Sequence, residues 1–139
     1  MIPGLDNADF VRYGVMHRNS FLDSPRLLNK DFSLRSNENI YFAGQITGVE
    51  GYMESASSGL LAGLNAVRKV NGEPPLLLGE NTMLGALTDY ISDPSVKNFQ
   101  PMGANFGILP PIEPKIRDKK ERYAALSKRA LDELEKVIK

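Results

Sequence analysis

Hydrophobic and polar positions along the chain predict one strand followed by three helices. Residues 39–44 are rich in aromatic and β-branched side chains and carry no charge, which is typical of a strand buried on both faces of a parallel sheet. From about Gly51 to Val70 the period becomes helical, and one face carries only small residues at spacings of three and four: Ala56, Gly59, Gly63 and Ala66. Because a glycine inside a helix costs about 1 kcal/mol relative to alanine, we expect this face to lie close to a neighbouring group.

Two more helices are predicted after a clear stop. Asn71-Gly72 is a C-terminal stop signal for the first helix, and Pro74-Pro75 prevents its resumption. Asn81 or Thr82 is a candidate cap for a second helix, whose apolar stripe consists of Met83, Leu84, Leu87, Tyr90 and Ile91. A third helix, from about residue 118 to 137, has an amphipathic face made of Tyr123, Leu126, Ala130, Leu134 and Val137.

The remaining segments are predicted to be loops. Residues 99–116 are rich in Pro and Gly but contain large apolar side chains that favour burial, so we expect an ordered loop there. Residues 1–36 carry turn signals such as Pro3-Gly4 and Ser24-Pro25 between short apolar pieces. This pattern predicts a loop-rich N-terminal segment with short strands and at most one brief helix.

Composition narrows the chemistry that the chain can perform. The 139 residues, 42% of them hydrophobic, suffice for one globular domain with a core. The absence of cysteine excludes a disulfide framework, a thiolate metal site and a cysteine nucleophile, and a single histidine excludes a multi-histidine metal site. We therefore predict no metal site. No apolar run approaches the roughly 20 residues that span a bilayer, which favours a soluble, cytoplasmic protein with no membrane partner.

Charge is balanced over the whole chain but not along it. Lys plus Arg number 17, as do Asp plus Glu, so no global field attracts nucleic acid. Residues 115–139 contain nine basic and five acidic side chains, a local excess of four positive charges. Such a run is either an ordinary solvated helix face or a surface that meets phosphate groups.

The junction between the predicted strand and the first helix is dense in glycine. Gly44, Gly48 and Gly51 would let the backbone approach a ligand closely, and the following helix start offers free N–H groups to an anion. Strand, glycine turn and helix form half of a dinucleotide-binding unit. The glycine spacing, however, does not follow G-x-G-x-x-G. The residues alone therefore leave ligand binding and tight structural packing equally open.

A resemblance favours ligand binding. The segment YFAGQITGVEGYMESASSGLLAGLNA, residues 41–66, resembles the late FAD-binding motif of a superfamily of tRNA-modifying flavoproteins, with its AGQ strand end and its G-x-x-GY-x-E-x-x-x-x-G helix start. Two families share the motif. One is the folate- and FAD-dependent tRNA (uracil-5-)-methyltransferase; the other is the glucose-inhibited division protein A family, which modifies the wobble uridine. The stretches MIPGLDNADFVRYGVMHRNSFLDSP, ANFGILPP and IRDKKERY resemble the methyltransferase family.

The resemblance implies an α/β fold: the closing part of an FAD-binding Rossmann-like domain, with a loop-rich N-terminal segment and C-terminal helices. Residues 1–36 would be the end of an inserted substrate domain and the crossover into the FAD domain. Residues 37–139 would be the C-terminal part of the FAD domain with a terminal helical layer. The chain matches the C-terminal third of the family, whose ADP-binding turn and catalytic cysteines lie in the part before it. We therefore expect no catalytic residue here and no activity from the chain alone.

The resemblance also implies residue roles. The implied cofactor-binding residues lie in the strand–turn–helix segment: Gly44, Gln45, Gly48, Val49, Glu50, Gly51 and Tyr52. Backbone N–H groups of this turn would face the flavin ring. The alternative is that Gly48 and Gly51 only form a turn and that Glu50 only complements the helix dipole. The implied substrate-binding residues are His17, Arg18 and Asn19 for folate and Lys119, Lys120 and Arg122 for tRNA phosphates. The histidine would stack on the pterin, although a lone histidine is more often structural.

The reaction implied for the parent enzyme moves a methylene carbon from 5,10-methylenetetrahydrofolate to C5 of a uridine in the tRNA T loop. FAD, reduced by NAD(P)H, supplies the reducing equivalents. The expected partners are tRNA, folate and the N-terminal part of the same polypeptide; the sequence does not predict the oligomeric state. The alternatives are a fragment of the wobble-uridine carboxymethylaminomethyl enzyme and a non-catalytic RNA-binding or structural module.

Overall fold

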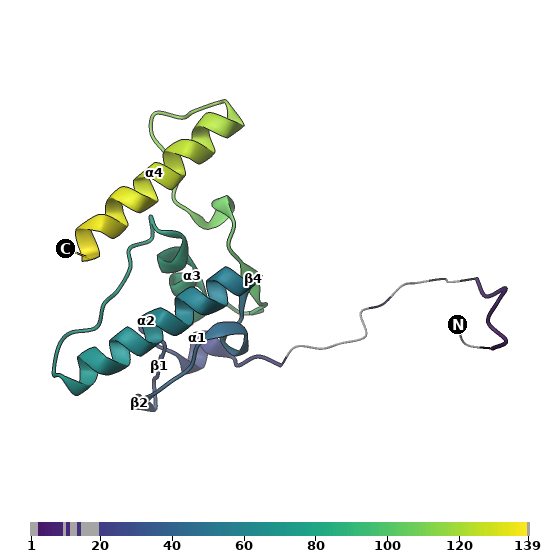
Figure 1. Ribbon diagram of the computed structural model, residues 1–139, viewed down its shortest axis with the longest axis horizontal. Helices are drawn as coiled ribbons and strands as arrows, with labels where there is room; N and C mark the ends of the chain where they lie inside the picture. Colours follow the sequence, from purple (N-terminus) through teal and green to yellow (C-terminus); the bar gives the residue numbers. More distant parts are fainter. Residues whose placement is uncertain (1–2, 10, 12–13, 15–19, 139) are drawn as a thin grey trace.

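The computed structural model describes residues 3–9, 11, 14 and 20–138 (Figure 1). His17, Arg18 and Asn19 lie outside the described residues. The chain forms α-helices, strands and two 3-10 helices in this order: α1 (Ser24–Leu27), β1 (Ser33–Leu34), β2 (Asn37–Tyr41), η1 (Gly44–Thr47), β3 (Val49–Glu50), α2 (Tyr52–Val70), α3 (Met83–Ser92), β4 (Met102–Gly103), η2 (Phe106–Ile108) and α4 (Lys119–Ile138).

The three predicted long helices are confirmed, and local side-chain chemistry sets their ends. Thr82 caps α3, because its hydroxyl oxygen accepts the N–H of Gly85 at 3.0 Å. Asp118 precedes α4 and accepts the N–H of Glu121 at 2.8 Å. Helix α2 ends before Gly72, whose φ of +71° is left-handed.

The sheets are small, and they correct one prediction. Strands β1 and β2 pair antiparallel, with Ser33 opposite Tyr41, whereas β3 and β4 pair parallel, with Val49 opposite Met102. The fold is therefore α/β. The strand predicted over residues 39–44 is confirmed only at residues 39–41, because β2 spans Asn37–Tyr41. Within the described residues β2 pairs with the antiparallel strand β1 and residues 37–40 are exposed, so the prediction of a strand buried on both faces of a parallel sheet is wrong there. The apolar residues Phe42 and Ala43, which suggested burial, follow β2, and β2 itself contains Asn37, Glu38 and Asn39.

The main core lies between α2, α3 and the segments that lead into and out of them. It contains Phe32, Val49, Leu61, Ala62, Leu87, Ile91 and Phe99. A smaller core attaches α4 and contains Ala86, Leu109 and Leu126. Phe99 and Leu109 are buried. This burial confirms the prediction that the segment of residues 99–116 is ordered and partly buried.

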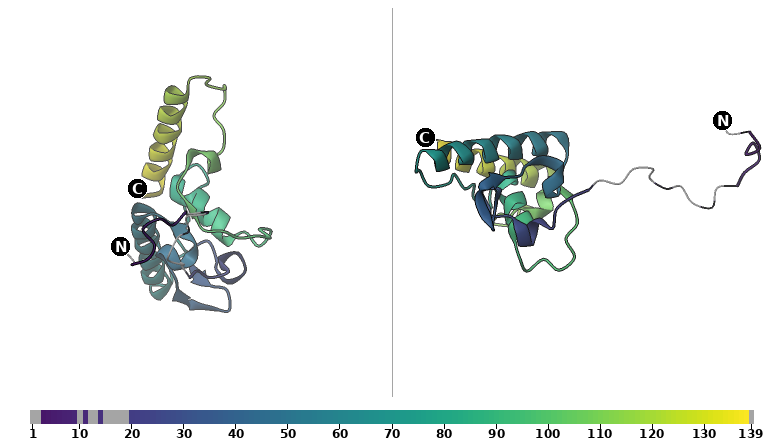
Figure 2. Two further views of the ribbon diagram at one scale, coloured as in Figure 1. Left: turned by 90° about the vertical axis from the view of Figure 1, so that its right-hand side faces the viewer. Right: turned by 90° about the horizontal axis from the view of Figure 1, so that it is seen from below.

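Helices α2 and α4 run in roughly the same direction along one side of the molecule (Figures 1 and 2). The small-residue face of α2 does not meet a neighbour: a Cβ built on Gly59 or Gly63 contacts nothing within 4 Å. The expected close approach is therefore absent among the described residues, because α2 packs on the core through a different face, which includes Leu61 and Asn65. Among the described helices, none is both long and apolar enough to cross a bilayer.

Candidate functional site

The glycine turn is held by backbone and hydroxyl hydrogen bonds from three directions. The N–H of Gly44 donates to the hydroxyl of Ser58 on α2 at 2.8 Å. The hydroxyl of Thr47 donates to the carbonyl of Gly44 at 2.7 Å. From the N-terminal side, the N–H of Leu22 donates to the carbonyl of Ile46 at 2.8 Å. The first bond joins η1 to α2, the second closes η1 on itself, and the third joins η1 to the segment before α1.

Backbone angles favour glycine at positions 48 and 51, and packing also requires it at Gly48. Both have left-handed backbone angles, with φ of +85° and +99°, which side chains other than glycine rarely adopt. A Cβ on Gly48 would overlap the ring of Phe99, and one on Gly51 would overlap the carboxylate of Glu54. Of the two explanations for these glycines, tight packing thus has direct structural support. It does not exclude a ligand on the other side of the turn.

Phe99 and Glu54 pack against the glycine turn, although the sequence alone indicated no role for either. Phe99 comes from the loop after α3 and closes the inner side of the turn. Glu54 accepts the N–H of Ala104 at 3.0 Å, so its carboxylate ties the start of α2 to the segment after β4. Glu54 occupies the acidic position of the G-x-x-GY-x-E motif, and this motif is the sequence signal that could have pointed to it. Phe99 had no local signal, because only tertiary packing brings it to the turn.

The predicted cofactor residues divide into a buried and an exposed group. Gly48 and Val49 are buried, and the backbone of Val49 and Glu50 belongs to the parallel ladder with β4. The side chains of Gln45 and Glu50 are exposed, and Tyr52 is 97% exposed. These exposed side chains form the outward surface of the turn.

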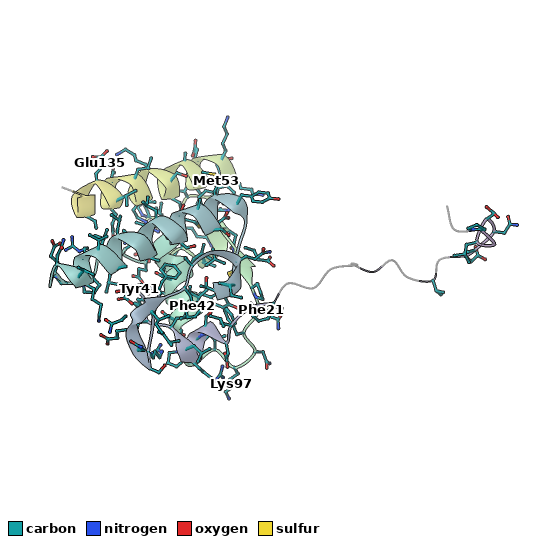
Figure 3. All side chains as sticks on the ribbon, turned by 60° about the horizontal axis from the view of Figure 1, so that its bottom comes forward. Phe21, Tyr41, Phe42, Met53, Lys97 and Glu135 are labelled. Carbon is teal, nitrogen blue, oxygen red and sulfur yellow. The ribbon has the colours of Figure 1, made fainter. Side chains whose placement is uncertain are left out.

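The outward surface has two properties that suit a partly apolar, partly anionic ligand. Met53 is 77% exposed and Ile46 is also exposed, so apolar side chains surround the helix start. The first N–H groups of an α-helix have no intrahelical acceptor and carry the positive end of the helix dipole. Figure 3 shows Met53 and Phe21 at the same end of the molecule. The turn thus offers hydrogen-bond donors beside accessible apolar area.

The predicted folate residues cannot be placed, but the residues that follow them can. The ring of Phe21 packs edge-on against Phe99, with centroids 5.9 Å apart. Together with the Leu22–Ile46 hydrogen bond, this contact holds the chain against the glycine turn a few residues after the predicted folate segment. The segment 17–19 itself lies outside the described residues.

The predicted tRNA-contacting residues lie on a different element, α4. Lys119 and Lys120 are exposed. Arg122 is half-buried, and one of its guanidinium nitrogens donates to the carbonyl of Ile116 at 3.4 Å. The structure therefore does not join this basic group to the glycine turn in one site.

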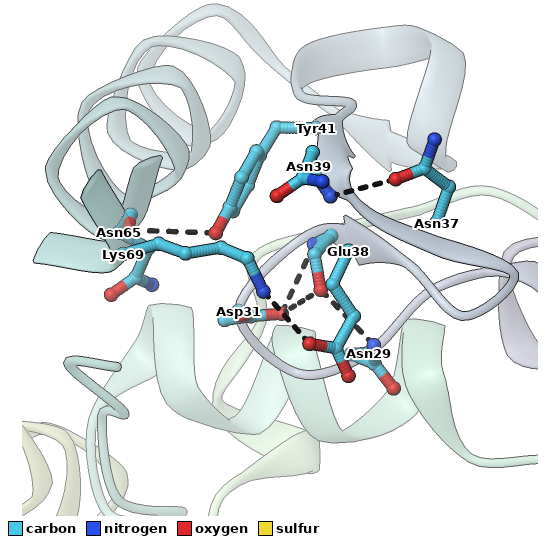
Figure 4. A network of polar contacts seen from close by, with 9 residues as sticks. Asn29, Asp31, Asn37, Glu38, Asn39, Tyr41, Asn65 and Lys69 are labelled. Carbon is cyan, nitrogen blue, oxygen red and sulfur yellow. Dashed lines mark hydrogen bonds and ion pairs between the residues drawn. The ribbon is translucent and has the colours of Figure 1, made fainter. Parts of the chain in front are cut away.

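A polar hollow of about 410 Å³ lies beside β2 and α2 (Figure 4). Asp31 accepts two hydrogen bonds from Ser33, and the ammonium of Lys69 lies 2.8 Å from the carboxylate of Glu38. The hydrogen bond to Glu38 raises the pKa of Lys69, and burial raises the pKa of Tyr41 above its usual 10.0. These groups satisfy one another and attach the hairpin to α2, so the network does not indicate a ligand. The described residues contain no cluster of acidic or histidine side chains that could hold a metal ion.

Comparison with known proteins identifies the family. The profile described as glucose inhibited division protein A matches residues 1–74, more than half of the 139 residues. The chain belongs to the glucose inhibited division protein A family.

Individual relatives show a more specific similarity than the family profile does. The chain is 61% identical over 139 residues to the methylenetetrahydrofolate–tRNA-(uracil-5-)-methyltransferase TrmFO of Streptococcus agalactiae. Proteins of the same name in Streptococcus suis and Streptococcus uberis are 58% and 59% identical. Each alignment covers 99% of this chain and 31% of the relative. The chain thus spans about a third of the length of the curated relatives it matches.

Proposed function

We propose that this chain is part of a folate- and FAD-dependent tRNA (uracil-5-)-methyltransferase. The observation that carries the proposal is the identity of 58–61% along the whole chain to proteins named for that reaction. In the proposed reaction, 5,10-methylenetetrahydrofolate donates the carbon and C5 of a T-loop uridine in tRNA receives it. FAD, when bound, would supply the reducing equivalents, which NAD(P)H would renew. Such an enzyme acts in the cytoplasm, where tRNA is modified.

Within that enzyme, the chain is proposed to be the closing part of an FAD-binding Rossmann-like domain. The exposed strand β2 supports this placement. Ile40 is 43% exposed, and one edge of β2 is unpaired among the described residues. A parallel strand from the rest of the polypeptide would pair with this edge. Residues 1–36 would then belong to the end of the inserted domain and residues 37–139 to the FAD domain, although the β1–β2 hairpin crosses that boundary.

The flavin is proposed to lie on the outward surface of the glycine turn. Gly44 and Gln45 would border it from η1, and Glu50, Gly51 and Tyr52 from the strand end and helix start. Gly48 and Val49 would support the turn from behind, because both are buried. The N–H groups at the start of α2 would hydrogen-bond to the ring and stabilise negative charge that develops on it.

A chimera tests the proposal directly. In it, this chain replaces the matching 139 residues of the Streptococcus agalactiae relative, which supplies the remaining polypeptide. The expected result is a yellow protein that methylates a T-loop uridine, whereas the chain alone methylates nothing. Modification of the wobble uridine instead would favour the second candidate, the carboxymethylaminomethyl enzyme suggested by the family description. A folded chimera that binds neither flavin nor tRNA would refute both.

Two exposed residues separate flavin contact from stability. Tyr52→Ala and Gln45→Ala should lower flavin occupancy of the chimera without changing the melting temperature of the flavin-free protein, because neither side chain is buried in the chain. Val70→Ala is the matched control, since Val70 is 88% exposed at the other end of α2. Full flavin occupancy in both variants would place the flavin elsewhere.

The folate role of His17 has its own test. If its ring stacks on the pterin, His17→Ala should weaken folate binding by up to about tenfold, since aromatic pairs contribute roughly 0.5–1.5 kcal/mol beyond burial. His17→Phe should retain most of the affinity, because a flat ring remains. A structural histidine would instead lower the melting temperature in both variants and leave folate affinity unchanged.

A further inference from the structure

A second hollow lies between the loop that follows η2 and the first turns of α4. Its volume is about 600 Å³, within the range of small-ligand sites. Figure 1 shows this loop arching from η2 to the start of α4, away from the β1–β2 hairpin. The hollow is lined by residues of both segments and by none of the glycine turn. It is therefore separate from the surface proposed for the flavin.

One wall of the hollow is aromatic and held in place by the core. The rings of Phe106 and Tyr123 stack with centroids 4.2 Å apart and an interplanar angle of 15°. Both residues line the hollow and are half-buried, so part of each ring remains accessible. Leu109 and Leu126 also line it, and both are buried. The aromatic wall is thus preformed rather than assembled by a ligand.

Two cations lie beside the aromatic wall: Arg122, which lines the hollow, and Lys119, which lies next to it. The ammonium nitrogen of Lys119 and the guanidinium carbon of Arg122 each lie 5.6 Å from the ring centroid of Tyr123. Residues 113–122 carry five basic and three acidic side chains, an excess of two positive charges. Among the described residues, none of the five basic side chains forms an ion pair: Lys115, Arg117, Lys119, Lys120 and Arg122. The excess positive charge of this stretch therefore favours an external anion.

We propose that this hollow binds an unpaired nucleotide of the RNA substrate. The base would lie against the Phe106–Tyr123 pair, and its phosphate would lie beside Lys119 and Arg122. Aromatic rings beside cations suit single-stranded nucleic acid, since every base has a face that can stack and every nucleotide carries a phosphate. An acidic peptide would use the cations but not the aromatic wall. The inference rests on the proposed function, because tRNA is the source of the unpaired nucleotide.

RNA binding by the full chain and by the chimera tests this site. The probes are a fluorescein-labelled RNA hairpin with an unpaired loop and a blunt RNA duplex of equal charge. Tyr123→Leu removes the stacking ring but keeps apolar bulk, whereas Tyr123→Phe keeps the ring. Lys119→Gln removes a cation that lies 5.6 Å from the centroid of the Tyr123 ring. Lys128→Gln is its control, because the ammonium of Lys128 is paired with Asp132 further along the same helix.

The expected result is that the hairpin binds more tightly than the duplex and that Tyr123→Leu weakens hairpin binding about tenfold, the usual loss for one stacked base. Tyr123→Phe should bind like wild type, and Lys119→Gln should weaken binding more than Lys128→Gln. Equal affinity for hairpin and duplex would overturn the proposal. It would also be overturned if polyglutamate displaced the hairpin from Tyr123→Leu as effectively as from wild type, because the ring would then contribute nothing to binding. If the chimera methylates uridine but does not prefer the hairpin, this site is rejected and the proposed function stands. If hairpin binding depends on the Tyr123 ring but the chimera does not methylate uridine, the enzyme assignment is rejected and the site stands.

Discussion

Replacing Gly48 with alanine measures how strongly the turn depends on its contact with Phe99. Two terms contribute to the expected loss of stability. A left-handed φ, here +85°, costs a residue with a Cβ roughly 1–2 kcal/mol. The new methyl group also overlaps the ring of Phe99, which is only 8% exposed, and overpacking of this kind costs roughly 1–3 kcal/mol. Gly48→Ala should therefore lower the free energy of unfolding by about 2–5 kcal/mol.

Gly72→Ala isolates the backbone term. Gly72 has a similar φ of +71°, but a Cβ there meets nothing within 4 Å, so the expected loss is only about 1–2 kcal/mol. Both variants are compared with wild type by chemical denaturation monitored by circular dichroism. The predicted difference of about 1–3 kcal/mol between them corresponds to roughly 3–12 °C in melting temperature.

The Phe99→Leu background decides whether the ring is the cause. Leucine lacks the ring edge that the new methyl group meets, so Gly48→Ala should cost no more there than Gly72→Ala does in wild type. The reasoning is refuted if Gly48→Ala and Gly72→Ala are equally destabilising, or if Phe99→Leu leaves the cost of Gly48→Ala unchanged. Either result would mean that the glycine is retained for a reason other than packing.

Three further predictions concern the framework around the turn. Asn65 is 1% exposed and exchanges two hydrogen bonds with the backbone of Leu76, so Asn65→Leu should cost roughly 2–4 kcal/mol in a denaturation assay. Thr82→Ala should cost about 1 kcal/mol by removing the cap of α3, and Thr82→Ser should not. Hydrogen bonds from Ser95 lower the pKa of Asp93 below its usual 3.8. The ionised Asp93 carboxylate therefore stabilises the folded state fully above pH 3.8, and this contribution is lost as the pH falls through the lower folded-state pKa. The melting-temperature advantage of wild type over Asp93→Asn should accordingly shrink below pH 3.8.

Local chemistry in the sequence determined the helices of this protein. The cap at Thr82, the stop at Gly72 and the apolar period of α4 each act within a few residues, so no tertiary information is needed to interpret them. The position of the strand–turn–helix segment followed from the same short-range patterns, whereas the α/β class followed from the family resemblance. The glycine-rich motif likewise indicated the family that the profile comparison identifies.

Tertiary structure decided what surrounds each element. An apolar strand predicts burial, but it cannot specify the partner, and β2 pairs with β1 and remains exposed in this chain. Two turn glycines could serve a ligand or packing; Phe99, far along the chain from Gly48, fills the inner side and leaves only the outer surface for a ligand. The physical reason is the same in both cases: capping and helical periodicity depend on neighbours in sequence, whereas pairing and close packing depend on residues that only the folded chain brings together.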